Sequence, residues 1–165
     1  MTMRFLLENI IDVKKFDVEK ENRAYRAYCK YMDTNRHRLP RNVYKFWKET
    51  WLAGPEGASE WNLHDMLLEG IEILPPALHD HRREINIAIR FNNMAIQNAH
   101  LRLNYIHVTQ YALTLEPEWA AHGSVSLHEI TLSKDGEIVH EIALDFSRIY
   151  IHCKKFTYTK EILNV

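Results

Sequence analysis

The stretch LHEITLSKDGEIVHEIALDF, residues 127–146, predicts an antiparallel hairpin and sets the kind of fold. Apolar and polar residues alternate on both sides of Asp135-Gly136, and an Asp-Gly pair between alternating runs is a strong signal for a two-residue hairpin turn. If these two residues form the turn, the register makes Glu129 a diagonal neighbour of His140 on one apolar face.

A Glu129–His140 pair has two interpretations. A buried carboxylate is costly unless it is paired, so the pair can be a structural one that fixes the strand register. It can also be a general acid/base dyad of a small enzyme or metal-binding protein, with His64 nearby. The structural interpretation is favoured, because core ion pairs perturb pKa values equally well. We therefore predict no catalytic residue, and Glu129, His140 and His64 are the residues to test.

The rest of the chain predicts helices first and strands afterwards. Apolar residues recur at three- and four-residue steps in residues 18–35 and again after Pro40, which is typical of amphipathic helices. From Leu67 onward the period is two, most clearly in EINIAIRF, residues 84–91. We expect an α+β domain over residues 1–165, with two N-terminal helices packed on one face of a mainly antiparallel sheet of about six strands.

A second His and acid pair, His64-Asp65, lies just ahead of the first apolar run in WNLHDMLLEGIEIL, residues 61–74. Adjacent residues of an extended chain point to opposite faces, so the two side chains are not expected to act together. We expect Asp65 to organise the loop by a side-chain-to-backbone hydrogen bond. His64 keeps an alternative role as a ligand or binding residue.

Metal and cofactor signatures are weak. His79 and His81 form a close pair, but no third ligand stands at a diagnostic spacing. The chain has neither a P-loop nor a G-x-G-x-x-G motif nor a G-x-S-x-G motif. Cys29 and Cys153 lie far apart and are interpreted as ordinary packing thiols of a reduced protein. We predict no metal and no cofactor.

Charge and hydropathy limit the location and the partners. The 21 Lys and Arg nearly balance the 22 Asp and Glu, giving a net charge of -1 without a long block of one sign. A nucleic-acid-binding protein normally shows a clustered basic excess. No apolar run reaches the ~18 residues of a membrane span, and the N-terminus does not read as a secretory signal. The expected location is the cytoplasm, with neither nucleic acid nor membrane as partner.

The order of the motifs also suggests a family. Two short helices, then NLHDMLLEGIEI, alternating strands and the hairpin of residues 127–146 resemble a group of small uncharacterised bacterial cytoplasmic proteins. The resemblance covers residues 39–156 and matches His64, Asp65, Glu129 and His140, without implying a catalytic role for them. Some proteins of this kind accompany polymorphic toxins as immunity proteins, which neutralise a toxin by binding it.

We therefore expect a non-catalytic protein-binding domain, and the resemblance implies a toxin domain as its partner. A homodimer is also compatible with the sequence. Loops rich in Trp, His and Arg supply side chains suited to an interface. The predicted partner-binding residues are Trp61, His79, His81, Arg82, Arg83 and Trp119.

Overall fold

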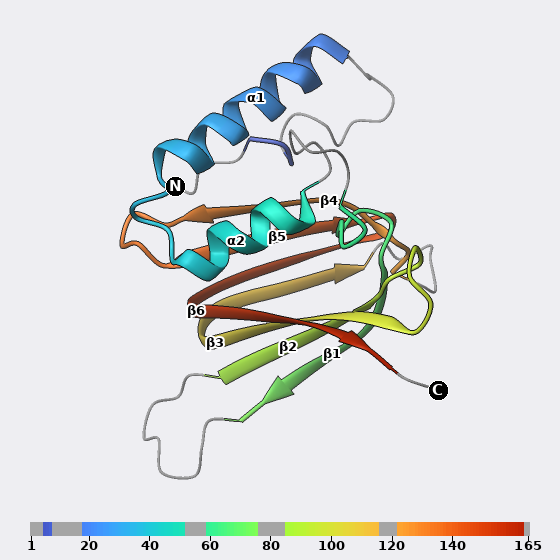
Figure 1. Ribbon diagram of the computed structural model, residues 1–165. Helices are drawn as coiled ribbons and strands as arrows, with labels where there is room; N and C mark the ends of the chain where they lie inside the picture. Colours follow the sequence, from blue (N-terminus) through green and yellow to red (C-terminus); the bar gives the residue numbers. More distant parts are fainter. Residues whose placement is uncertain (1–4, 8–17, 52–58, 76–84, 116–121, 164–165) are drawn as a thin grey trace.

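The computed structural model describes residues 5–7, 18–51, 59–75, 85–115 and 122–163. Two helices precede six strands, which form one antiparallel sheet in the order β1-β2-β3-β6-β5-β4 (Figure 1). The elements are α1 (Val18–Thr34), α2 (Arg41–Thr50), β1 (Leu67–Leu74), β2 (Ile85–Asn92), β3 (Ala99–Leu115), β4 (Val125–Leu132), β5 (Ile138–Leu144) and β6 (Ser147–Ile162). The α+β class, the N-terminal helices and the six-stranded antiparallel sheet are as predicted. Neither described helix is long and apolar enough to cross a membrane.

The two longest strands, β3 and β6, bend together and fold the sheet over on itself (Figure 1). His107 has a φ of 55°, and the register of β3 against β6 shifts between Val108 and Gln110. Such irregularities bend the strand that carries them and increase its local twist. The alternating runs at residues 101–105 and 111–115 are thus one strand whose two ends belong to different halves of the sheet.

The core lies where the two halves of the folded sheet face each other. The ring of Phe156 on β6 lies 6.0 Å from the ring of His140 on β5. Phe46 of α2 packs between them, with its ring centroid 5.0 Å from Phe156 and 5.8 Å from His140. All three side chains are buried. Burying a Phe side chain contributes about 1.5–3 kcal/mol to the stability of a fold. Because Phe46 contacts both halves of the sheet, this contribution links α2 to both of them.

Helix α1 contacts the edge strand β4 through tyrosine hydroxyls. The amide of Ile130 donates to the hydroxyl of Tyr28 at 2.7 Å, and the same hydroxyl donates to the Ile130 carbonyl at 3.2 Å. The amide of Leu132 donates to the hydroxyl of Tyr31 at 2.8 Å. These contacts satisfy backbone groups that an edge strand would otherwise leave open to a neighbouring chain.

The turn between β4 and β5 is longer than predicted. The amide of Gly136 donates to the Ser133 carbonyl at 3.1 Å, and the amide of Ser133 donates to the Glu137 carbonyl at 2.8 Å. Gly136 has a φ of 81°, the left-handed conformation that ends a type I turn in a three-residue hairpin loop. The loop is therefore residues 134–136, and the predicted two-residue turn is wrong.

The extra loop residue moves the hairpin register by one position. Glu129 lies opposite Glu141, and His140 lies opposite Ile130. A shift of one residue sends a side chain to the other face of the sheet. Glu129 and His140 therefore point to opposite faces, and neither the structural pair nor the acid/base dyad predicted from the sequence exists.

Candidate functional site

His140 belongs instead to a buried chain of polar side chains inside the folded sheet. Its Nδ1 lies 2.8 Å from the hydroxyl of Tyr105 on β3, and its Nε2 lies 3.2 Å from Nδ1 of His128 on β4. All three residues are buried, and Phe46 and Trp51 pack against the imidazoles. The sequence-based register made Glu129 rather than His128 the diagonal neighbour of His140, so this network was missed.

The surroundings keep both imidazoles neutral. Burial lowers the pKa of His128 to about 4. Burial, with His128 beside it, lowers the pKa of His140 well below its ordinary value. Protonation of both rings would also place two N–H groups face to face across the 3.2 Å contact. A neutral imidazole donates from one nitrogen and accepts at the other, which suits a continuous chain of hydrogen bonds.

Glu129 has a structural role on the opposite face of β4. The amides of Phe5 and Leu6 donate to its Oε2 at 3.2 and 2.8 Å, so the carboxyl group ties the N-terminal segment to the sheet. Burial raises the pKa of Glu129, the amide hydrogen bonds oppose that rise, and the facing carboxyl of Glu141 adds to it. These contacts use Oε2 of the carboxyl group, which lies on the face of β4 opposite to the histidines.

His64 and Asp65 do contact each other, contrary to the prediction from an extended chain. Asp65 has a φ of 68°, so the backbone turns there, and Nδ1 of His64 lies 2.9 Å from Oδ2 of Asp65. The side-chain-to-backbone bond of this loop comes from Asn62, whose Oδ1 accepts from the His64 amide at 3.1 Å. The sequence located the loop correctly but assigned its organising residue wrongly.

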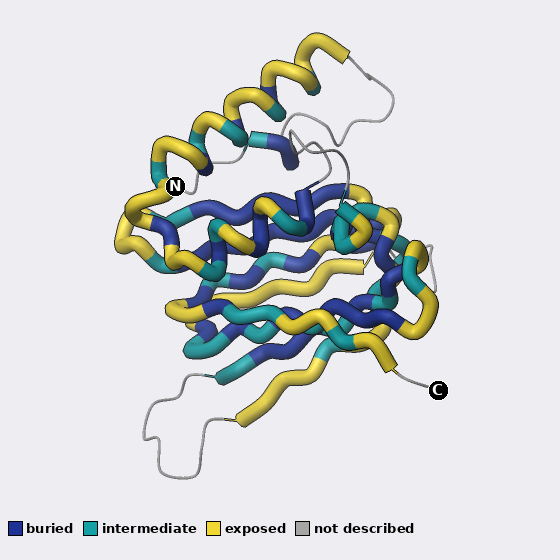
Figure 2. The backbone as a smooth tube through the Cα atoms, in the orientation of Figure 1, coloured by how far each residue is buried: buried dark blue, intermediate teal, exposed yellow. Residues whose placement is uncertain are grey.

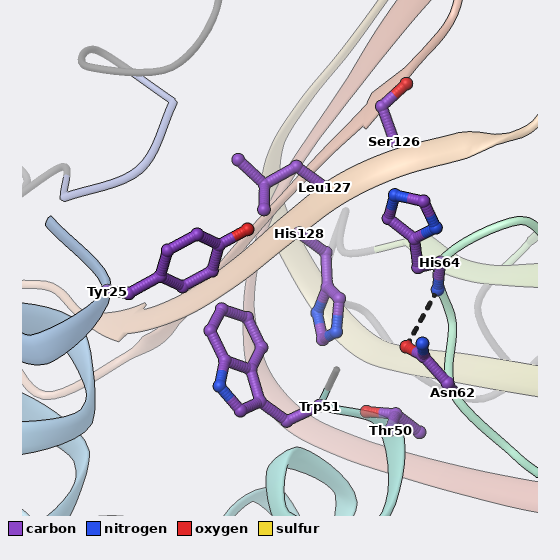
Figure 3. Close-up of a pocket in the computed structure, with 8 residues that line it drawn as sticks. All are labelled: Tyr25, Thr50, Trp51, Asn62, His64, Ser126, Leu127 and His128. Atoms are coloured by element: carbon purple, nitrogen blue, oxygen red, sulfur yellow. Dashed lines mark hydrogen bonds between the residues drawn. The ribbon is translucent and has the colours of Figure 1, made fainter. Parts of the chain in front are cut away.

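A small pocket is lined by both His64 and the buried His128 (Figure 3). About 10 Å³ of it is open to the centre of a water molecule, which is room for about one water. The pocket brings together the middle of α1, the C-terminal end of α2, the loop before β1 and the start of β4. Its lining residues are Tyr25, Thr50, Trp51, Asn62, His64, Ser126, Leu127 and His128. It is too small for a substrate.

A larger hollow of about 160 Å³ lies on the other side of the His64 loop. It is lined by residues of the segments 59–66 and 93–95. The buried Asn93 fixes these walls, because its Oδ1 accepts from the amides of Ala95 and Ile96 and its Nδ2 donates to the Glu60 carbonyl at 2.8 Å. Met94 on the wall is 64% exposed. The hollow therefore combines fixed walls with an exposed apolar side chain.

The predicted partner-binding residues fall into two groups. Trp61 is described, and it lies next to Glu60 and Asn62 of the hollow, partly buried. Nζ of Lys160 lies 5.3 Å from the centroid of its ring, a distance that allows a cation–π interaction. The others lie outside the described residues: His79, His81, Arg82, Arg83 and Trp119.

Met94 and Asn93 could not be identified as candidate residues from the sequence, because an Asn-Met pair in a loop carries no specific signal. Within the described ranges, no three His, Cys, Asp or Glu side chains gather in a way that could hold a metal ion.

Comparison with known proteins adds no assignment, since neither a protein-family model nor a curated protein matches the sequence.

Proposed function

We propose that this chain is a non-catalytic protein-binding domain and that it holds its partner at the hollow between segments 59–66 and 93–95. The exposure of Met94 beside this hollow is the observation that carries the proposal. Met and Trp are enriched at protein interfaces, and energetically important contacts cluster around pockets. Trp61 lies between Glu60 and Asn62, which line the hollow, and is itself partly buried.

The fixed walls favour tight binding. Asn93 ties the turn after β2 to Glu60, and Asn62 ties the loop that carries His64. A surface that is already ordered loses less conformational entropy when a partner docks. The adjacent His64–Asp65 pair offers charge and hydrogen bonds at the polar rim of such an interface.

The resemblance stated from the sequence makes a toxin domain the partner within this proposal, as for immunity proteins. The alternative, a small enzyme or metal-binding protein, required Glu129 and His140 in an open cleft. Both residues are 1% exposed and lie on opposite faces. Binding without catalysis is therefore the function that the described residues support best.

The test is capture of a partner from the native host by the tagged protein, followed by purification and calorimetric titration of that partner. We expect Met94→Lys to weaken binding at least tenfold, because it places a charge where an apolar contact is buried. Val18→Lys is the matched control, since Val18 is 57% exposed but lies at the start of α1. Equal affinity of both variants and the wild type would exclude the hollow.

The loops are tested in the same titration. Alanine at the six predicted partner-binding residues, Trp61, His79, His81, Arg82, Arg83 and Trp119, should also weaken binding if the loops extend the contact. Identification of the partner as a domain of a secreted toxin would support the immunity function. A partner of another kind would leave the binding role and overturn the immunity assignment.

A further inference from the structure

The end of β3, residues 109–115, has a paired strand on one side only among the described residues. β2 pairs with β3 only as far as Val108, whereas β6 continues to pair with it, Leu113 lying opposite Ile149. No residue in the described part of the chain pairs with the other side of this segment. Every residue from 109 to 115 is exposed, in contrast to the buried strand β5 (Figure 2). Its outer backbone groups are thus available to another strand.

This edge carries an apolar row. Tyr111, Leu113 and Leu115 are 46%, 45% and 44% exposed, and as alternate residues they share one face of the strand. Their partners on β6 include Ile149 and Ile151, which are buried. The row therefore continues the face that forms the core, but half of its surface remains in water.

Two other edges of the sheet are protected, and none of the described residues protects this one. The tyrosine hydroxyls of α1 cover β4, and β1 carries Glu69, Glu72 and a register shift before Gly70. Covers, charges and irregularities are the usual means by which an edge avoids pairing with another chain. The segment TQYALTL, residues 109–115, contains no charged residue, no Pro and no Gly. An unprotected edge of this kind indicates a surface that pairs.

We propose that residues 109–115 pair antiparallel with the same segment of a second copy of this chain, across a two-fold axis. With Ala112 on the axis, Tyr111 lies opposite Leu113 of the second copy, and Leu113 lies opposite its Tyr111. Aromatic and aliphatic side chains in directly opposite positions stabilise antiparallel strands, whereas like charges there destabilise them. The segment has no charge, so self-pairing brings no like charges together. Each copy contributes the same surface, as a closed two-fold dimer requires.

This dimer is independent of the proposed function, because Met94 and its hollow belong to a different part of the chain.

Analytical ultracentrifugation over about a hundredfold range of concentration should show a second species of twice the 19.6 kDa chain mass. Two charged variants, Y111K/L113K and Y111E/L113E, should each weaken dimerisation at least tenfold. Mixing the two should restore a dimer, since opposite charges then face each other. Met94→Lys is the control and should stay dimeric.

Two outcomes would overturn the proposal: a wild type that is monomeric at every concentration, or variants that dimerise as strongly as the wild type. Thermal melting by circular dichroism establishes whether the variants are folded. We expect them to fold, because Tyr111 and Leu113 are both exposed. Hydrogen exchange on the wild type gives a second test without substitution. The amides of residues 110–114 should exchange more slowly in concentrated than in dilute protein, and equal exchange counts against the dimer.

Discussion

At the scale of single residues, the His128–His140 contact makes the fold sensitive to acid. Both histidines have a lower pKa in the folded protein than in the unfolded chain, whose ordinary value is 6.5. Between pH 6.5 and about 4 the unfolded chain therefore binds more protons, and stability falls as the pH falls. For His128 alone the loss is about 3 kcal/mol. Urea unfolding at a series of pH values should show this decline.

Replacement of both histidines by glutamine should flatten that decline while lowering stability at pH 7, since the hydrogen bond to Tyr105 is weakened. His37→Gln is a suitable control, because His37 is exposed, and it should keep the wild-type pH dependence. If the double variant loses stability below pH 6.5 as steeply as the wild type, the acid sensitivity arises from other groups.

Glu129 makes the stability of the fold depend on pH in the opposite direction to the two histidines. Its pKa is raised in the fold, so the stability it contributes is present below its unfolded value of 4.5 and is lost as the pH rises through the folded value. Glu129→Gln keeps an oxygen for the amides of Phe5 and Leu6 without a buried charge. We expect this variant to be at least as stable as the wild type at pH 7. Glu129→Leu should be less stable than the wild type by about 1–3 kcal/mol, because it leaves the two amides without an acceptor. Denaturant titration measures both, and a Gln variant as unstable as the Leu variant would contradict the assignment.

At the scale of elements, the cover of β4 by α1 depends on one hydroxyl above all. Tyr28→Phe removes the partner of both the amide and the carbonyl of Ile130. We expect a loss of about 1–3 kcal/mol, because these buried groups are left without a partner. Tyr25→Phe on the same helix is the control, and it should cost less, since Tyr25 packs on Trp51 and is only partly buried. Thermal unfolding of both variants decides the matter, and equal losses would show that the bonds to Ile130 contribute nothing specific.

The hairpin shows how far the sequence predicts an element and where it stops. Alternation located β4 and β5 and the Asp135-Gly136 turn between them. A Gly in the left-handed conformation fits both a two-residue and a three-residue loop, so the pattern alone does not fix the register. That single residue decided whether Glu129 or His128 lies beside His140. The helices and the antiparallel sheet could therefore be predicted, whereas the buried site could not.

At the scale of the whole molecule, the structure depends on α2 filling the space between the two halves of the folded sheet. The ring centroid of Phe46 lies within 5.8 Å of the ring centroids of four residues: His128, His140, Phe156 and Tyr158. Phe46→Ala should cost about 3–5 kcal/mol, because it opens a cavity that the folded sheet cannot close. Lys45→Ala, exposed on the same helix, should cost at most about 1 kcal/mol. Denaturant unfolding gives both values.

The same substitution links the packing to the histidines. The pKa values of His128 and His140 are low chiefly because burial disfavours the charged imidazole, and Phe46 contributes to that burial. A cavity lined partly by two imidazoles has polar partners for water, so Phe46→Ala should admit water and raise both pKa values. Titration of the imidazole resonances by NMR would show the rise, and the decline of stability below pH 6.5 should become shallower. Unchanged histidine pKa values in a folded variant would mean that the sheet alone, without α2, excludes water from the site.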